Sequence, residues 1–278
     1  MISYKSSFYL KSKIDRLKAE GKKIGFVPTM GSLHQGHISL IKAAKEECDF
    51  VVCSIFVNPT QFNNPNDLVK YPRTLEADSN LLKAAQCDFL FSPSVKTIYP
   101  NGTGGFVAPK VGEIVNVLEG EHRPGHFEGV MQVVSLLLDH VNPSHLYMGL
   151  KDFQQFAICS KMVAIQKRPI LMRGMPIVRE ENGLAMSSRN ARLSAGGVGK
   201  ASLIFESLLL VREGKEKHSL SQLRAMAVQN IQKDKAFKIE YLEIVDQESL
   251  MPSSNMSNLI VLCAVWLEGI RLIDNMIL

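Results

Sequence analysis

The sequence lacks the features that mark membrane, secreted and zinc-binding proteins. It contains no stretch of about 18 apolar residues, so we expect no membrane-spanning helix and no membrane partner. Its five cysteines are scattered and form no Cys-x-x-Cys pair, which favours reduced thiols in a cytoplasmic protein over disulfides or zinc. The first residues, Met-Ile-Ser-Tyr-Lys, become charged at once, and we therefore expect no signal peptide.

Dense clusters of positive charge, internal repeats and low-complexity segments are also absent. The formal net charge is +5 over 278 residues without a Lys/Arg run, so we expect no nucleic-acid partner. A mild basic surplus suits an enzyme with a polyanionic substrate. With 46% hydrophobic and 21% charged residues, the chain has enough apolar material for a folded core.

In its first part the sequence alternates between apolar strands and amphipathic helices. Residues 24–30 and 50–57 predict buried strands, and residues 37–47 between them predict a helix. The alternation continues with helices at 74–86, 127–140 and 152–167, strands at 88–92, 145–149 and 168–173, and a long loop at 93–110. We predict an α/β fold with a Rossmann-like, doubly wound parallel sheet, whose ligands bind beyond the carboxyl ends of the strands.

The character of the chain changes after about residue 177. Residues 180–200 are polar and rich in glycine. Helices are predicted at 200–213 and 219–233, and strands at 238–246, 258–265 and 270–274. We therefore predict two domains, residues 1–177 and a smaller α+β domain of residues 178–278.

A pair of histidines flanked by glycines lies where the first buried strand meets the first helix. Gly31 and Gly36 allow the backbone to turn and to approach a ligand closely. We expect His37 to start the helix, whose free N–H groups and dipole favour a phosphate. His34 and His37 can face one side and donate to developing negative charge. Surface or metal-binding histidines are the alternative, but the position after a buried strand favours phosphate binding.

Polar side chains follow two of the other strands at the same expected edge. Asn58 and Gln61 are uncharged amides that suit a substrate with hydroxyls and a carboxylate, although a polar turn would also explain them. Lys151 can neutralise triphosphate charge, and Asp152 is a natural N-cap. Gln155, about one turn later, can face the same pocket.

Three further features are more ambiguous. Asp78 lies near the start of a helix, where the dipole alone explains an acid, and magnesium binding is the second interpretation. Arg123, in a segment rich in turn residues, suits either a mobile phosphate-binding cation or a solvated loop. Ser187, Ser188 and Arg189 form a loop able to hold phosphate, which is weak evidence alone.

Together these segments resemble a known family. His-x-Gly-His, followed about 150 residues later by Ser-Ser-Arg, is similar to the nucleotidylyltransferase superfamily and its Lys-Met-Ser-Lys-Ser loop. Five segments resemble pantothenate synthetases in order and spacing, and Arg271-Leu272-Ile273-Asp274-Asn275 closes the chain as in that family. The five are Pro-Thr-Met-Gly-Ser-Leu-His-Gln-Gly-His, Ser-Ile-Phe-Val-Asn-Pro-Thr-Gln-Phe, Arg-Pro-Gly-His-Phe, Lys-Asp-Phe-Gln-Gln and Gly-Leu-Ala-Met-Ser-Ser-Arg-Asn.

The resemblance implies an ATP-dependent condensation of pantoate with β-alanine, through a pantoyl-adenylate, in pantothenate and coenzyme A biosynthesis. His37, His34 and Lys151 would be catalytic, Gln61 and Gln155 would bind pantoate, and Gln61 would also lie near β-alanine. Magnesium would assist, residues 178–278 would form a lid, and a homodimer would form through the N-terminal domain. The implied ATP-binding residues are Met30, Gly31, Ser32, Leu33, His34, Gln35, Gly36, His37, Gly149, Leu150, Lys151, Asp152, Val178, Met186, Ser187, Ser188 and Arg189.

One position departs from the family pattern. Many members have Glu before Lys-Asp, where this chain has Leu150, and the lost carboxylate would matter if it contacted ATP or its metal.

Three alternative functions stay open. The chain could be a nucleotidylyltransferase acting on a phosphate acceptor, a nucleotide-binding relative that no longer catalyses, or a fragment related to tRNA synthetases.

Overall fold

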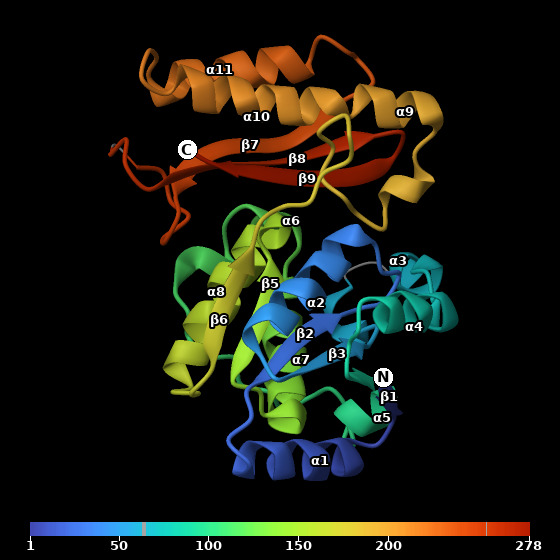
Figure 1. The fold of residues 1–278 in the computed structure, drawn as a ribbon. Coiled ribbons are helices and arrows are strands. Elements are labelled where there is room, and N and C mark those ends of the chain that lie inside the picture. Colours follow the sequence, from blue (N-terminus) through green and yellow to red (C-terminus); the bar gives the residue numbers. More distant parts are fainter. Residues whose placement is uncertain (63–64, 254) are drawn as a thin grey trace. The chain divides into compact units, whose positions relative to one another are not determined.

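The computed structural model describes residues 1–62, 65–253 and 255–278 (Figure 1). Its strands are β1 (Ile2–Tyr4), β2 (Ile24–Thr29), β3 (Phe50–Ile55), β4 (Phe89–Phe91), β5 (His145–Gly149), β6 (Leu171–Met175), β7 (Lys238–Asp246), β8 (Leu259–Leu267) and β9 (Ile270–Ile277). Its α-helices are α1 (Ser7–Ala19), α2 (Gln35–Glu47), α3 (Pro65–Lys70), α4 (Leu75–Ala84), α5 (Val95–Ile98), α6 (Glu119–His122), α7 (His126–Val141), α8 (Phe153–Ile165), α9 (Ala195–Lys200), α10 (Ser202–Gly214) and α11 (Leu220–Ile231). Short 3₁₀ turns are η1 (Pro59–Gln61), η2 (Glu113–Val115), η3 (Leu150–Asp152) and η4 (Asn190–Arg192).

Six parallel strands of the described chain form one sheet, in the order β1-β4-β3-β2-β5-β6. Its central strands bury almost every side chain, as the continuous apolar, β-branched run of β3 predicts for that strand. The chain moves from β2 to β3 on one side and later returns to the other side of β2 as β5. The carboxyl ends of β2 and β5 therefore flank a topological switch point, where ligands bind in sheets of this kind.

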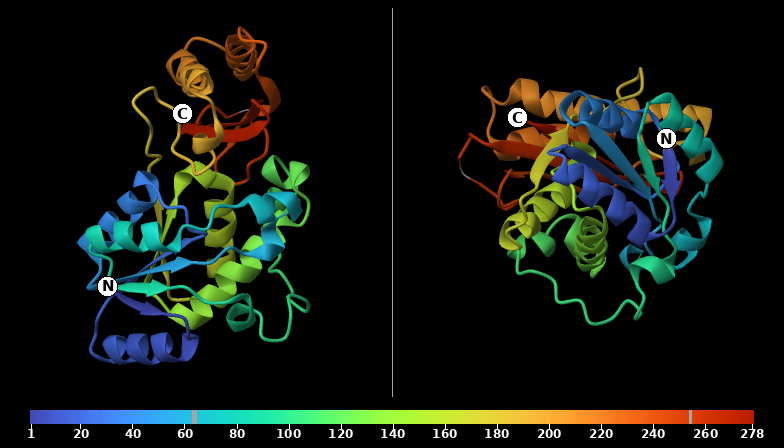
Figure 2. Two further views of the ribbon diagram at one scale, coloured as in Figure 1. Left: turned by 90° about the vertical axis from the view of Figure 1, so that its right-hand side faces the viewer. Right: turned by 60° about the horizontal axis from the view of Figure 1, so that its bottom comes forward.

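Helices cover both faces of this sheet. Figure 2 shows α2 and α4 on one face and α1, α7 and α8 on the other. On α2, Ile38, Ile41 and Ala44 face the sheet at helical spacing and are buried. The predicted doubly wound α/β fold is confirmed.

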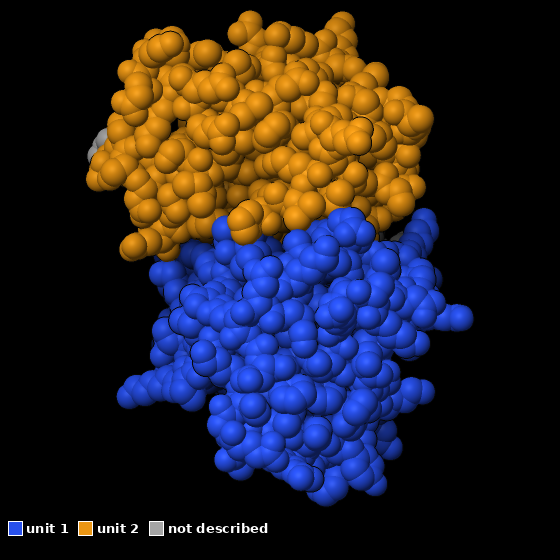
Figure 3. All heavy atoms as spheres, in the orientation of Figure 1, with its two compact units in different colours: residues 1–150, 155–175 blue, residues 151–154, 176–278 orange. Residues whose placement is uncertain are grey.

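The chain divides into two compact units, shown in different colours in Figure 3. Residues 1–150 and 155–175 form the first unit, which contains the parallel sheet. Residues 151–154 and 176–278 form the second. In the described part of that unit, β7, β8 and β9 form an antiparallel sheet, and α10 and α11 pack on it around a core that includes Leu208, Leu223 and Val261.

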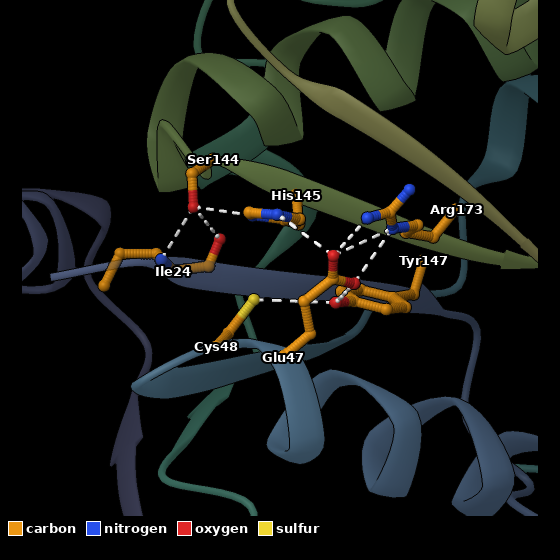
Figure 4. Close-up of polar contacts among 7 residues, drawn as sticks. All are labelled: Ile24, Glu47, Cys48, Ser144, His145, Tyr147 and Arg173. Atoms are coloured by element: carbon orange, nitrogen blue, oxygen red, sulfur yellow. Dashed lines mark hydrogen bonds and ion pairs between the residues drawn. The ribbon is translucent and has the colours of Figure 1, made fainter.

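A polar cluster ties the end of α2 to β5 and β6 in the first unit (Figure 4). The Glu47 carboxylate accepts hydrogen bonds from Tyr147 Oη at 2.6 Å and from the Arg173 guanidinium. His145 Nε2 lies 3.6 Å from Glu47 Oε1, and Tyr147 Oη lies 3.6 Å from Cys48 Sγ. Because the guanidinium and the phenol both stabilise the charged carboxylate, the pKa of Glu47 is lowered from 4.5 to about 2.

Several local predictions need correction. The prediction missed β1, α1 and α3, and α5 interrupts the predicted loop at 93–110. In α1 the exposed aromatic residues Phe8 and Tyr9 obscure the buried stripe that Leu10 and Ile14 belong to. The last parallel strand is β6 at residues 171–175 rather than 168–173, and this edge strand has one exposed and four half-buried residues, which gives a weak sequence signal.

None of the helices in the described ranges combines the length and apolar character needed to cross a bilayer.

Candidate active site

The His34 and His37 side chains close the N-terminus of α2. His34 is the N-cap in an extended conformation, and its Nδ1 accepts the backbone N–H of Gly36 at 3.2 Å. The Nδ1 of His37 accepts the backbone N–H of His34 at 3.3 Å, which completes a reciprocal capping box. The helix therefore begins at Gln35, and the expectation that His37 starts it is wrong. His37 lies at the third helical position because His34 terminates the extended segment.

This cap also fixes the chemistry of the two rings. A backbone N–H can only donate, so each Nδ1 must be an unprotonated acceptor. In a neutral ring the proton then lies on Nε2, and Nε2 becomes the donor. The ring centroids are 4.1 Å apart, which places the two imidazoles side by side at a helix N-terminus. This arrangement suits the stabilisation of negative charge on a phosphate.

Asp78 of α4 holds the loop that leads into this cap. Its buried carboxylate accepts the backbone N–H of Ser32 at 2.9 Å and of Leu33 at 2.8 Å, and Thr74 Oγ1 lies 3.2 Å from both oxygens. The loop needs such support, because Gly31 and Ser32 both have positive φ values, 84° and 52°. Both oxygens of Asp78 thus accept hydrogen bonds from the loop and from Thr74, and magnesium binding by Asp78 stays a prediction. The described residues contain no group of three or more His, Cys, Asp or Glu side chains that could hold a metal.

Backbone groups fix the orientation of the Asn58 amide after β3. The Thr60 N–H can only donate, and it lies 3.4 Å from Asn58 Oδ1. The Gly129 carbonyl can only accept, and it lies 3.1 Å from Asn58 Nδ2. Tyr99 Oη adds a hydrogen bond of 2.7 Å to Oδ1, and burial raises the pKa of Tyr99, which keeps this donor protonated. These contacts therefore fix the Asn58 amide in one orientation, in which Nδ2 donates and Oδ1 accepts.

The fixed orientation of Asn58 also fixes the orientation of the Gln61 amide. Asn58 Nδ2 donates to Gln61 Oε1 at 3.0 Å, so the acceptor half of the Gln61 amide is occupied. The donor half, Nε2, lies 3.0 Å from Met30 Sδ, beside the loop that carries the histidines. Gln61 can thus offer N–H bonds to a bound carboxylate or hydroxyl.

Helix α7 supports the η1 turn that carries Gln61, and this support was not predicted from the sequence. The ring Nδ1 of His126 lies 2.8 Å from the carbonyl oxygen of Gln61. A Cβ on Gly129 would lie 2.5 Å from the Thr60 carbonyl oxygen, so only glycine allows α7 to approach η1 this closely. The sequence signal was a glycine inside an apolar helix, one turn after the Arg-Pro-Gly-His-Phe segment. Arg123 of that segment lies 3.6 Å from Glu119.

The residues after β5 lie in the η3 turn. Leu150 packs on β6, since a Cβ on Gly174 would lie 2.7 Å from Leu150 Cδ2 and 2.9 Å from Phe156 Cζ. Asp152 is exposed and directly precedes α8, and its carboxylate lies 3.9 Å from Lys151 Nζ. Gln155 is half-buried on the first turns of α8.

In the second unit the chain reverses between Val178 and Met186. The backbone N–H of Met186 donates to the Val178 carbonyl at 3.0 Å, and Gly183 turns the chain with φ at 88°. Ser187 follows at once, and its Oγ accepts the Arg189 N–H at 3.2 Å. The structure thus brings Val178 and Met186 to Arg189 together in one turn of the second unit. In the first unit it pairs His34 with His37 and Met30 with Gln61.

Sequence comparisons identify the family of the chain. A family model described as pantoate-beta-alanine ligase matches residues 4–277. The chain is 46% identical over 271 residues to a pantothenate synthetase of Bacteroides fragilis, covering 96% of this chain and 95% of that relative. It is 43% identical over 283 aligned positions to a pantothenate synthetase of Cytophaga hutchinsonii, covering 100% of this chain and 99% of that relative.

Solved structures give the same result. A crystal structure of pantothenate synthetase from Thermus thermophilus has a TM-score of 0.93 and 38% identity, over 99% of both chains. A pantoate-beta-alanine ligase from Francisella tularensis, complexed with beta-gamma ATP and beta-alanine, has a TM-score of 0.83 and 39% identity, over 100% of this chain and 97% of that one. Since the family model and these relatives match over nearly the whole length, the chain belongs to the pantoate–β-alanine ligase family.

Proposed function

We propose that this chain activates pantoate with ATP to a pantoyl-adenylate and transfers the pantoyl group to β-alanine, forming pantothenate, AMP and pyrophosphate. The observation that carries the proposal is the pair of Nε2 donors that the His34–His37 cap presents at the N-terminus of α2. The Francisella relative, complexed with beta-gamma ATP and beta-alanine, supports the choice of substrates.

In the first step a pantoate carboxylate oxygen attacks the α-phosphorus of ATP, and the bond to pyrophosphate breaks. Negative charge grows on the phosphate oxygens in the transition state. Two imidazole N–H groups and a helix N-terminus stabilise that charge without forming a covalent intermediate. His37 and His34 are the catalytic residues of this step, together with Lys151, whose ammonium neutralises the triphosphate.

Gln61 and Gln155 bind pantoate in this proposal. The Gln61 Nε2 donates to pantoate oxygens, because Asn58 occupies its Oε1. In the second step the β-alanine amine, near Gln61, attacks the carbonyl carbon of the adenylate. The carbon–oxygen bond to AMP then breaks, and the amine loses a proton as the amide forms.

ATP is proposed to contact three segments of the chain. They are Met30 to His37, Gly149 to Asp152, and Val178 with Met186 to Arg189, in which Ser187, Ser188 and Arg189 hold phosphate. The described residues offer no acidic cluster, so we propose that Mg²⁺ enters as the complex with ATP rather than as a resident metal.

Family membership supports three further proposals. We propose that residues 1–177 bind nucleotide and pantoate, that residues 178–278 act as a lid, and that the chain forms a homodimer through its N-terminal domain. The cytoplasm is the proposed compartment, and the five buried cysteines, which are thiols rather than disulfides, agree with a reducing environment.

An omission experiment tests the proposal. With MgATP, pantoate and β-alanine together, AMP and pyrophosphate should appear in equal amounts. Omission of pantoate should abolish both products. A nucleotidylyltransferase acting on a phosphate acceptor would release pyrophosphate without AMP, and a binding module would release neither.

A further inference from the structure

The C-terminal segment Arg271 to Asn275 contains the acidic member of a largely buried ion pair for which the proposed mechanism has no use. Asp274 of β9 is 3% exposed and accepts Arg179 Nη1 at 2.6 Å and Nη2 at 2.9 Å. The backbone N–H of Asn275 donates a third bond to it at 2.7 Å. Burial raises the pKa of Asp274, and the guanidinium opposes this rise by stabilising the charged form.

Arg179 connects this pair to the chain reversal before Ser187. Its Nη1 also donates to the Gly183 carbonyl at 2.9 Å, and its guanidinium lies 4.2 Å from the centre of the Phe205 ring. Gly183 itself is held against Phe205, because a Cβ there would lie 2.2 Å from that ring. The turn that presents Ser187 and the residues after it is therefore anchored on Asp274.

The neighbouring residue anchors a second proposed phosphate-binding segment. Asn275 Nδ2 donates to the backbone carbonyl of Lys151 at 2.9 Å. Lys151 and Ser187 are far apart in sequence, yet both segments are tied to adjacent residues of one strand in the second unit.

We propose that Asp274 and Asn275, acting through Arg179 and the Lys151 backbone, are positioning residues that set the register of the cationic groups binding the ATP triphosphate. The inference rests on the proposed function of Lys151, Ser187, Ser188 and Arg189. A bidentate, buried guanidinium–carboxylate pair suits this role, because its planar geometry fixes orientation as well as distance. Catalytic groups displaced by about 1 Å can lower a rate by about 100-fold.

The test uses three variants of the full chain: Asn275→Ala, Asp274→Asn and Arg179→Lys. Asp274→Asn turns an acceptor into an amide that presents N–H groups to the guanidinium, and lysine cannot reproduce the forked contact. In pantoate-dependent exchange of pyrophosphate with ATP, each variant should lower kcat/KM for ATP by roughly 10- to 100-fold. The KM for pantoate should change less than about twofold.

Glu240→Gln is the matched control. Glu240 pairs with Arg271 in the same sheet, and neither residue is among the proposed phosphate-binding groups. The Glu240→Gln variant should have a lower unfolding temperature and an unchanged kcat/KM for ATP. If Asp274→Asn does not fold, Asn275→Ala decides, because it removes one amide and leaves the ion pair in place.

A double-mutant cycle separates positioning from a purely structural role. If Asn275 acts through Lys151, Asn275→Ala should have little further effect on kcat/KM in a Lys151→Ala background. An undiminished effect there, or normal ATP kinetics in all three folded variants, would overturn the inference. Absence of exchange in the unaltered chain would instead contradict the proposed function, so the two failures are distinguishable.

Discussion

The Nδ1 atom of His37 accepts the backbone N–H of His34 at 3.3 Å, so the two proposed catalytic histidines also form the N-terminal cap of α2. Capping and catalysis thus use opposite nitrogens of the same rings. Capping contributes to stability through Nδ1, and phosphate binding needs the donor at Nε2.

The first prediction separates these two roles. His34→Ala and His37→Ala should each lower the rate of adenylation by roughly 10²–10³-fold, which is the usual effect of removing one transition-state donor. His34→Asn should lower the rate as much while keeping most of the stability, because Asn is a strong N-cap residue. Pyrophosphate exchange and thermal unfolding measure the two effects. Ser39→Ala, on the same helix, should leave the rate near normal, and a fully active His34→Asn would argue against a catalytic imidazole.

The second prediction concerns the polarity of Gln61. Gln61→Ala and Gln155→Ala should weaken pantoate binding by about 1–3 kcal/mol each and change ATP binding much less. Gln61→Glu should be at least as damaging as Gln61→Ala, because it replaces the donor Nε2 by an acceptor. Steady-state KM values for both substrates provide the check. Better pantoate binding by Gln61→Glu than by Gln61→Ala would refute the assigned orientation.

The third prediction concerns Leu150, where many relatives have Glu. The chain should be active, and Leu150→Glu should change kcat/KM for ATP by less than about tenfold, or 1.4 kcal/mol. The same substitution should lower the unfolding temperature, because it places a carboxylate against Gly174 and Phe156. Leu150→Met, which conserves volume, should change neither. An inactive chain that Leu150→Glu rescues would show that a carboxylate is essential there.

The fourth prediction is a pH dependence of stability. The pKa of Glu47 is about 2 in the folded chain against 4.5 ordinarily, so its contribution is fully present above pH 4.5 and declines as the pH falls toward 2. The groups that face it are Arg173, Tyr147 and His145, and burial lowers the pKa of His145.

Urea unfolding between pH 2 and 7 measures this effect. Glu47→Gln should lower stability at pH 7 and flatten its decline below pH 4.5. Glu20→Gln, at the exposed Arg16–Glu20 pair, should leave the profile almost unchanged. A Glu47→Gln profile parallel to that of the unaltered chain would contradict the assignment.

The main strands were predictable because their signal is local. Residues 50–55 form an apolar run rich in β-branched side chains, which suits a sheet buried on both faces, and residues 145–149 contribute the buried Leu146, Tyr147 and Met148. Strand β1 has three residues, and α1 exposes Phe8 and Tyr9, so neither produces a clear period.

The site was predictable as a set of residue types but not as a network. Glycines around His34 and His37 marked a ligand-binding turn, whereas Gly36 left the start of the helix ambiguous. The contacts of Asp78 with Ser32 and Leu33 span about 45 residues, and that of Arg179 with Asp274 spans 95. Such pairings depend on tertiary packing, which no local pattern encodes.

The most direct test of the account is isotope exchange between pyrophosphate and ATP in the absence of β-alanine. The account predicts exchange that depends on pantoate, because the adenylate forms before the amine is needed. Addition of β-alanine should then release AMP and pantothenate in equal amounts. Exchange that requires β-alanine, from a chain that still makes pantothenate, would contradict the stepwise adenylate mechanism.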